Sequence, residues 1–155
     1  MTNDAPILSV QNLSISLGEF ALHDVSLEAT AGDYVCLIGP TGAGKTILIE
    51  CVAGLHHPRE GHVVLSGVDV SKVPPERRRI GYVPQDYALF PHMNVFDNIA
   101  YGLVERGAAK SVSRRKVQAM ADLVRIPHLL QRRVSTLSGG EQQRVALARA
   151  LIARP

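Results

Sequence analysis

LIGPTGAGKT, residues 37–46, is the most informative stretch of this 155-residue sequence. Gly39, Gly44, Lys45 and Thr46 stand at the spacing GxxxxGK[ST] of a loop that cradles phosphate groups. The lysine supplies a full positive charge at the β- and γ-phosphates, and the threonine hydroxyl is a ligand for Mg²⁺. The stretch therefore predicts a site for a nucleotide and magnesium.

The residues on either side of this loop fit such a site. Residues 33–39, DYVCLIG, form a nearly continuous apolar run that predicts a strand covered on both faces. A helix is predicted from about residue 44 to residue 53, with Gly54 as its C-terminal stop. The helix N-terminus would add free N–H donors and about half a positive charge. The loop glycines at 39, 42 and 44 are expected to take backbone angles closed to other residues, so that amide groups turn toward an anion.

A second glycine-rich helix start lies in LSGGEQQ, residues 137–143. Ser138 followed three residues later by Glu141 is a capping box, which stabilises a helix by about 1 kcal/mol. Gly139 and Gly140 weaken the same first turn by about 1 kcal/mol each relative to alanine. Because glycine lets backbone N–H groups approach a ligand closely, this start predicts a second anion-binding site.

The order of elements changes along the chain. Alternating apolar and polar residues predict an antiparallel pair of strands over residues 7–17 and 23–30, joined by a turn at Gly18–Glu19. Short strands are also predicted over residues 62–67 and 79–85. After about residue 88 the pattern is helical, with helices over residues 93–107, from a cap at Ser111 or Ser113 onward, and over residues 140–153. The expected apolar faces of the first two helices comprise Val95, Ile99, Leu103 and Val104, and Val117, Met120, Ala121 and Val124.

The composition is that of a globular protein, with 46% hydrophobic and 20% charged residues. No apolar run reaches the roughly 18–20 residues of a membrane span, and the first residues show no secretory signal, so we expect a cytoplasmic chain unless another chain holds it at a membrane. The net charge of +3 has local sources at residues 77–79, 114–116 and 132–133. Solvated faces or a phosphate-bearing ligand are favoured for these clusters over nucleic acid.

The cysteines and histidines predict no metal site and no disulfide. Cys36 and Cys51 lie in apolar surroundings without CxxC spacing, and we expect buried thiols. The six histidines show no ligand spacing with acidic partners.

Three motifs together resemble the ATP-binding cassette (ABC) ATPases, the motor subunits of membrane transporters. They are GPTGAGKT at residues 39–46, a glutamine in YVPQDYALFPHMNVFDNI at residues 82–99, and LSGGEQQRVALARAL at residues 137–151. The resemblance covers the whole chain. It implies two cassettes packed head to tail, each closing its LSGG motif over the ATP held by the partner's phosphate loop.

This resemblance assigns the site residues. Lys45 and Gln85 would have catalytic roles, and Gln85 would reach Mg²⁺ and the attacking water and couple to the transmembrane subunits. Thr46 and Gln85 would be the Mg²⁺ ligands. Contacts with bound ATP would come from Gly39, Pro40, Thr41, Gly42, Ala43, Gly44, Lys45, Thr46 and Ile47, and across the dimer from Ser138, Gly139, Gly140 and Gln142.

The position of the adenine-stacking ring is the one departure from the family pattern. The family usually places an aromatic residue where this chain has Leu17, and Phe20 lies three residues further on. Either Phe20 supplies the ring or adenine packs on aliphatic surface.

The implied fold is α/β: a P-loop NTPase core of the ABC ATPase type with an N-terminal antiparallel β subdomain and a helical subdomain, truncated before the Walker B strand. We expect one partial domain over residues 1–155. The β subdomain and ATP-binding core would occupy residues 1–87, the helical subdomain residues 88–140, and the signature helix, returning to the core, residues 141–155. The chain would then be the N-terminal portion of a longer cassette, and strands 33–38 and 79–84 would expose unpaired edges, which favours aggregation or partial disorder.

Hydrolysis in this family also needs a strand that ends in an aspartate for Mg²⁺, followed by a glutamate general base. Asp69 follows a strand, but a Ser-Gly turn intervenes and Val70 comes next, which favours a turn aspartate. Asp122 lies within a helical pattern. We therefore expect an ATPase by family whose present chain alone lacks turnover.

The motif sequences resemble those of bacterial and archaeal importers, most of all the molybdate/tungstate importer ATPases, although sulfate, polyamine, iron and sugar importers share much of them. The implied function is to couple the binding and hydrolysis of ATP, with Mg²⁺, to uptake of a small solute such as an oxyanion. The implied partners are a second copy in a homodimer, transmembrane permease subunits and, indirectly, an extracytoplasmic solute-binding protein, at the cytoplasmic face of the membrane.

Two other functions are kept as alternatives: a nucleotide-binding fragment without turnover, and a cassette protein that acts on nucleic acid or ribosomes. The coiled-coil insertions or second cassette typical of the latter are not visible, so nucleic acid is not expected as a partner.

Overall fold

The computed structural model describes residues 5–153, which form two compact units divided between Ile80 and Gly81. Each unit has its own hydrophobic core. The expected α/β class is confirmed, since the first unit contains an antiparallel sheet and the second is helical. The domain boundaries given above stay a prediction. Among the described residues, the helices are too short or too polar to span a bilayer.

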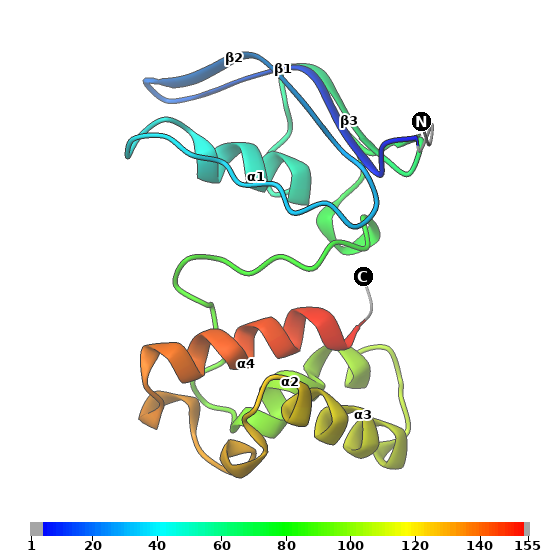
Figure 1. Ribbon diagram of the computed structural model, residues 1–155, viewed down its shortest axis with the longest axis vertical. Coiled ribbons are helices and arrows are strands. Elements are labelled where there is room, and N and C mark those ends of the chain that lie inside the picture. The colour runs from blue at the N-terminus through cyan, green and yellow to red at the C-terminus, as the bar shows by residue number, and fades with distance from the viewer. Residues whose placement is uncertain (1–4, 154–155) are drawn as a thin grey trace. The chain divides into compact units, whose positions relative to one another are not determined.

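The first unit is built on a four-stranded antiparallel sheet (Figure 1). β1 (Leu8–Leu17) lies between β2 (Phe20–Ala29) and β3 (Glu60–Leu65), and β3 pairs with the short β4 (Val68–Asp69). Leu17 faces Phe20 across the Gly18–Glu19 turn. The predicted antiparallel pair is confirmed, with the second strand beginning earlier than expected, at Phe20.

α1 (Lys45–Ala53) packs on this sheet. Its buried Leu48 and Cys51 join the strand residues Leu13 and Val63 in one core. The helix ends at Gly54, whose φ of 89° is left-handed and whose N–H donates to the Cys51 carbonyl oxygen at 3.1 Å. The predicted helix and its glycine stop are therefore confirmed, and the sheet fixes the helix that begins at the phosphate loop.

The second unit is a bundle of three helices, α2 (Val95–Val104), α3 (Lys110–Leu123) and α4 (Gly139–Ile152). Two short 3-10 turns, η2 (Pro127–Leu129) and η3 (Val134–Thr136), lie between α3 and α4, and a third, η1 (Pro75–Arg77), belongs to the first unit. The bundle core includes Val95, Ile99, Leu103, Val117, Ala121, Ile126, Leu129, Val145 and Ala148. Most of the predicted apolar faces are therefore buried, but Val104 is exposed.

Two predicted strands do not form in the structure. Residues 33–39 and 80–84 have no regular secondary structure, and Tyr34 and Ile38 are 96% and 91% exposed. A strand is stable only where a neighbouring backbone accepts and donates its hydrogen bonds, and none of the four described strands pairs with either segment. An apolar run alone therefore gave a wrong prediction. Cys36, in the first segment, is exposed rather than buried, whereas Cys51 is buried as predicted.

The predicted serine cap of α3 is also wrong. The helix begins at Lys110 after Ala109, because the chain turns sharply at Gly107, whose φ is 72°. Ser113 then lies inside the helix with its N–H bonded to the Ala109 carbonyl oxygen at 3.0 Å. Its hydroxyl oxygen is buried without a hydrogen-bond partner among the described residues.

Candidate nucleotide site

The phosphate loop leads directly into the first turn of α1. Gly42 and Gly44 both have a φ of 85°, a left-handed backbone that side chains other than glycine rarely adopt, and Gly44 is the N-cap of the helix. The Lys45 ammonium folds back over the loop and donates to the carbonyl oxygens of Gly39 at 2.9 Å and Pro40 at 2.7 Å. A full positive charge and the free N–H groups of a helix start therefore lie together at this loop, as an anion requires.

Gly39 differs from the other two glycines of the loop. Its φ is not left-handed, and a Cβ built there would meet only the Cβ of Ala43, at 3.5 Å. The expected special backbone angle is confirmed for Gly42 and Gly44 and is wrong for Gly39, because the chain reverses at the two later positions.

Side chains of β2 pack against the phosphate loop at Gly44. A Cβ at Gly44 would lie 2.5 Å from Cζ of Phe20 and 2.5 Å from Cδ2 of Leu22. Phe20 is half-buried, while Leu17 opposite it is exposed. The ring of Phe20 is therefore beside the loop, and its stacking on adenine stays a prediction.

Thr46 has the exposure that a metal ligand needs. The residue is exposed, and its hydroxyl has no hydrogen bond within residues 5–153. Thr41 and Ala43 are exposed as well, while Ile47 packs against the core of the first unit. The Ala43 N–H donates to the Pro40 carbonyl oxygen at 3.2 Å. The N–H groups at the start of α1, the ammonium of Lys45 and the free hydroxyl of Thr46 together fit a nucleotide with magnesium.

Arg78 holds the far end of α1. It is 5% exposed and donates to the carbonyl oxygens of Cys51 at 2.8 Å, Val52 at 3.0 Å, Val73 at 2.7 Å and Ser71 at 3.2 Å. A cation at a helix C-terminus is favourable to the helix dipole, although burial lowers the pKa of this guanidinium. The expectation of a solvated or ligand-binding cluster at residues 77–79 is wrong for Arg78, because a run of three arginines does not show which one turns inward.

The predicted capping box starts α4. The Glu141 carboxylate accepts from the Ser138 N–H and from the Ser138 hydroxyl, both at 2.8 Å, and these bonds lower the pKa of Glu141. The capping-box prediction is confirmed. Because its hydroxyl is engaged with Glu141, Ser138 is held in place at the exposed start of the helix.

The fold does not require the two glycines that follow. Gly139 and Gly140 are exposed, and neither has a left-handed φ. A Cβ at Gly139 would meet nothing within 4 Å, and one at Gly140 would meet only an Arg144 nitrogen, at 3.9 Å. Two helix-weakening residues without a packing reason support a role outside this chain's own fold, in which a ligand approaches the backbone.

Gln142 has a structural role in the same region. Its side-chain amide donates to the Leu137 carbonyl oxygen at 3.2 Å, and a longer contact of 3.4 Å reaches the Val134 carbonyl oxygen. The amide nitrogen therefore points back into the turn before α4. Its expected contact with a γ-phosphate stays a prediction.

Gln85 is exposed and lies beside α4. It lines a hollow of about 670 Å³ with Val83, Pro84 and Tyr87 on its own segment and with Gln143, Arg144 and Leu147 on the helix. The second unit thus brings the predicted Gln85 together with the helix that begins at Ser138, two motifs that are more than fifty residues apart in sequence.

The turn after Gln85 is held by Arg149, a residue that the sequence did not single out. Its guanidinium donates to the carbonyl oxygens of Ala88 at 2.8 Å and Tyr87 at 3.0 Å, and lies 5.0 Å from the ring centroid of Phe90. Tyr87 and Ala88 have φ values of 63° and 42°, a left-handed conformation that costs about 1–2 kcal/mol per residue. Charge-assisted hydrogen bonds, worth about 1.5–3 kcal/mol each, are strong enough to offset that cost.

Asn98 fixes the other end of this turn. It is 0% exposed, and its side chain both accepts from the Phe90 N–H at 2.8 Å and donates to the Phe90 carbonyl oxygen at 3.1 Å. The Phe90 ring also stacks against Tyr101, with centroids 4.6 Å apart. Residues 87–90 are therefore attached to both α2 and α4.

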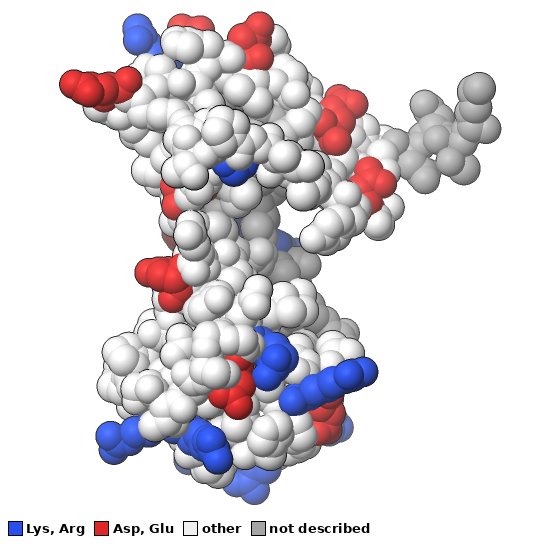
Figure 2. All heavy atoms as spheres, turned by 60° about the vertical axis from the view of Figure 1, so that its left-hand side comes forward, with Lys and Arg blue, Asp and Glu red and all other residues white. Residues whose placement is uncertain are grey.

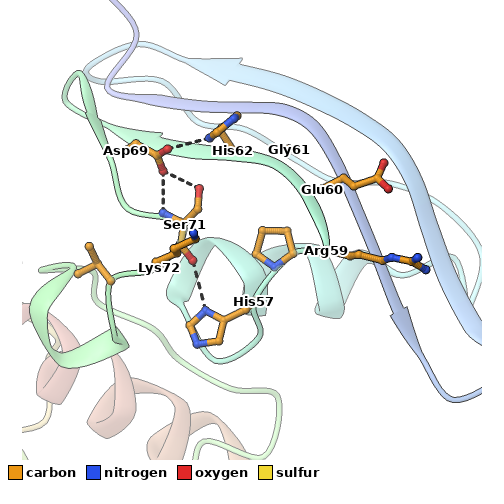
Figure 3. Close-up of a pocket in the computed structure, with 10 residues that line it drawn as sticks. His57, Arg59, Glu60, Gly61, His62, Asp69, Ser71 and Lys72 are labelled. Atoms are coloured by element: carbon orange, nitrogen blue, oxygen red, sulfur yellow. Dashed lines mark hydrogen bonds and ion pairs between the residues drawn. The ribbon is translucent and has the colours of Figure 1, made fainter.

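A further hollow, of about 650 Å³, lies in the first unit beside the end of β4 (Figure 3). The Asp69 carboxylate accepts from the Ser71 hydroxyl at 2.6 Å, the Ser71 N–H at 2.8 Å and His62 Nδ1 at 2.7 Å, and these bonds lower its pKa to about 2. Ser71 and His62 both bond to the carboxylate and not to each other, so they form no nucleophile–base pair. Asp69 ends β4 rather than lying within a turn, and its bonds fasten the strand to the segment that follows it.

Charge is distributed unequally between the units. Residues 81–155 carry 11 Lys and Arg against 5 Asp and Glu, whereas residues 1–80 carry 6 against 9. On the face of the helical unit that Figure 2 shows, basic side chains lie at several separate places. The clusters at residues 114–116 and 132–133 are exposed, which fits solvated faces.

The sequence and the structure are similar to known proteins along nearly the whole chain. The sequence pattern of the family described as ABC transporter matches residues 22–155. A molybdate/tungstate import ATP-binding protein of Methanocaldococcus jannaschii is 52% identical over 149 residues, which make up 96% of this chain and 50% of that protein. A sulfate/thiosulfate import ATP-binding protein of Burkholderia mallei is 49% identical over 154 residues, 96% of this chain and 44% of that protein.

A solved structure is also similar. It is the ATP-binding cassette MJ0796, a dimer in a post-hydrolysis state with bound ADP and Pi, with a TM-score of 0.84 and 28% identity over 96% of this chain and 70% of the solved one. The chain thus spans about half the length of the curated relatives it matches.

Proposed function

Because this chain belongs to the ABC transporter family, we propose that it forms part of the ATP-binding subunit of an importer. It binds Mg-ATP at residues 39–47 and contributes to coupling ATP binding and hydrolysis to uptake of a small solute. The observation that carries the proposal is the phosphate loop, where two left-handed glycines and the Lys45 ammonium surround the start of α1.

Each residue of the phosphate loop has a distinct role in this proposal. The backbone N–H groups of Gly42, Gly44, Lys45 and Thr46 and the N-terminal dipole of α1 would hold the phosphates. The Lys45 ammonium, which donates to the Gly39 and Pro40 carbonyls, would supply positive charge to the β- and γ-phosphates. The Thr46 hydroxyl and the Gln85 side chain would hold Mg²⁺, which when bound would offset the phosphate charge. Phe20, beside the loop, stacks on adenine.

The Ser138–Gly140 start of α4 binds the γ-phosphate of a second copy, with Gln142 nearby. Its exposed backbone and its glycines, which the fold does not require, support this role. The dimeric state of the similar solved cassette, with ADP and Pi, supports a homodimer, and the arrangement that we propose for it is head to tail.

The solute that we propose is an oxyanion such as molybdate or tungstate. The names of the similar proteins support this class, since one imports molybdate and tungstate and another imports sulfate and thiosulfate. The proposed partners are the permease subunits of the membrane and, through them, an extracytoplasmic solute-binding protein, which places the chain at the cytoplasmic face of the membrane. Nucleic acid is not a proposed partner.

We expect the 155-residue chain alone to bind ATP without turning it over. Asp69 is engaged by Ser71 and His62, and Asp122 lies in α3, where it accepts from Gln118 at 3.0 Å. Both carboxylates therefore already accept hydrogen bonds from neighbouring side chains of their own unit.

The test is calorimetric titration of the chain with Mg-ATP, together with an assay for released phosphate. Lys45→Ala should abolish binding, whereas Lys72→Ala, which removes an exposed lysine of the same unit outside the loop, should leave the affinity unchanged. Unchanged affinity of the Lys45 variant would refute the phosphate-loop assignment. Steady phosphate release by the purified chain would refute the expectation of binding without turnover.

A further inference from the structure

The strongest feature that the proposed function leaves unexplained is the environment of Arg149. This side chain is half-buried on α4, and burial lowers its pKa. No acidic residue forms a salt bridge with it within residues 5–153. Its donors are directed to the carbonyl oxygens of Tyr87 and Ala88 at 3.0 Å and 2.8 Å. A half-buried cation whose donors go to backbone carbonyls has a defined structural target, which is the turn that follows Gln85.

The turn at residues 87–88 needs stabilising contacts from other parts of the chain. Tyr87 and Ala88 are consecutive left-handed residues without being glycine, and such a conformation persists only where the surroundings enforce it. Within the turn the described backbone provides one hydrogen bond, from the Tyr87 N–H to the Pro84 carbonyl oxygen at 3.0 Å. The guanidinium of Arg149 supplies two more bonds and also contacts the Phe90 ring.

Arg149 lies on the same helix as the Ser138 cap, so its contact connects the turn at residues 87–88 with the start of α4. α4 begins at the Ser138 cap and carries Arg149 on the third turn, while Gln143, Arg144 and Leu147 between them face Gln85 across the shared hollow. A helix is stiff over this length, so the start of α4 and the turn at residues 87–88 are connected through one rigid element.

We propose that Arg149 is a positioning residue that ties the Gln85 segment to the helix that begins at Ser138, so that a displacement of one is transmitted to the other. The proposal rests on the proposed function, in which Gln85 acts at one ATP site and Ser138 at another. In this arrangement Arg149 contacts neither ATP nor magnesium and acts through the backbone of Tyr87 and Ala88.

The test measures amide hydrogen exchange of the 155-residue chain, resolved to single residues by NMR. Arg149→Met removes the donors, Arg149→Lys keeps the charge without the forked geometry, and Arg144→Met is a matched control because Arg144 is exposed on the same helix. In Arg149→Met, the Tyr87 and Phe90 amides should exchange at least about tenfold faster while the α4 core amides keep their rates. Arg149→Lys should give an intermediate change, and Arg144→Met none.

Mg-ATP then tests transmission, which a purely structural role would not affect. In the wild type, added Mg-ATP should change exchange at the first turn of α4, and this response should be lost in Arg149→Met while the affinity for Mg-ATP changes less than about twofold. A response that persists in Arg149→Met, or no response in a wild type that binds Mg-ATP, would overturn the proposal.

Two further outcomes distinguish failure of the Arg149 proposal from failure of the proposed function. If exchange rises equally throughout α4 in both Arg149 variants, or if Arg149→Lys does not fold, the residue holds the whole unit together and the proposal is overturned. If the wild type binds no Mg-ATP, the proposed function fails instead, and the comparison without nucleotide still decides whether Arg149 holds the turn.

Discussion

Replacing Gly139 and Gly140 by alanine should make the protein more stable. Glycine-to-alanine changes stabilise by about 0.4–1 kcal/mol where the native backbone suits alanine, because they reduce the conformational entropy of the unfolded chain. Both positions meet that condition, since neither φ is left-handed and the new Cβ atoms would meet nothing within 4 Å at Gly139 and one Arg144 nitrogen at 3.9 Å at Gly140. The double variant should therefore gain about 1 kcal/mol or slightly more.

Thermal unfolding followed by circular dichroism measures this gain. A stabilisation of about 1 kcal/mol raises the Tm of a unit of this size by roughly 4–8 °C. Gly102→Ala is the matched control, because Gly102 lies inside α2 and a Cβ there would make an ordinary contact of 3.9 Å with Ala153. It should also raise the Tm.

The two variants should differ in function. The Gly139/Gly140 double variant should weaken the association of two copies in Mg-ATP, because the added methyl groups occupy space that the γ-phosphate of the ATP held by the second copy needs. Gly102→Ala should not weaken it. Analytical ultracentrifugation measures this association. A lower Tm for the double variant would show that the fold needs these glycines and would refute the reasoning from the structure. A higher Tm with undiminished association would refute their proposed role toward the partner.

Three other perturbations test the first unit. Arg78→Met should lower the free energy of unfolding by about 3 kcal/mol in urea titrations, because it removes the guanidinium hydrogen bonds to the carbonyl oxygens of Cys51 and Val52 at the end of α1 and to those of Val73 and Ser71. The exposed Arg77→Met should change it by less than about 0.5 kcal/mol, and equal effects would contradict the assigned contacts. Gly42→Ala should weaken Mg-ATP binding through the left-handed backbone alone. Gly44→Ala should weaken both stability and binding more, since its Cβ would also meet Phe20 and Leu22. Calorimetry and thermal unfolding check this pair, and equal effects of the two variants would show that the loop is not packed on β2. Because the folded pKa of Asp69 is about 2, below the unfolded value of about 3.9, its contribution to stability is present above about pH 4 and lost as the pH falls toward 2. Asp69→Asn should flatten the stability curve of the wild type over that range in urea titrations at a series of pH values, and an unchanged slope would be evidence against the hydrogen bonds to Ser71 and His62.

The features that could be predicted from the sequence are those that depend on neighbours along the chain. Gly54 ends α1 because a left-handed residue closes the last turn, whatever lies elsewhere. Ser138 and Glu141 form the capping box within one turn of helix. The spacing of the phosphate loop is equally local, and it placed Lys45 and Thr46 at the start of α1 as expected.

Contacts between distant segments could not be predicted in the same way. The apolar residues 33–39 predict a strand by composition, yet a strand exists only through the hydrogen bonds of a neighbour, which the sequence of the segment does not specify. The placement of Gln85 beside α4 likewise depends on how the helical unit folds back on itself.

The arginines show most clearly the difference between what the sequence predicts and what the tertiary structure decides. By itself the sequence determined that this chain has a phosphate loop, a capped glycine-rich helix start and the motif order of the ABC transporter family, because these are patterns of adjacent residues. Only the tertiary structure decided that the side chains of Arg78 and Arg149 turn inward and bind backbone carbonyls. A guanidinium does so where folding removes both it and the carbonyl oxygens from water, and that desolvation is a property of the assembled unit rather than of any stretch of sequence.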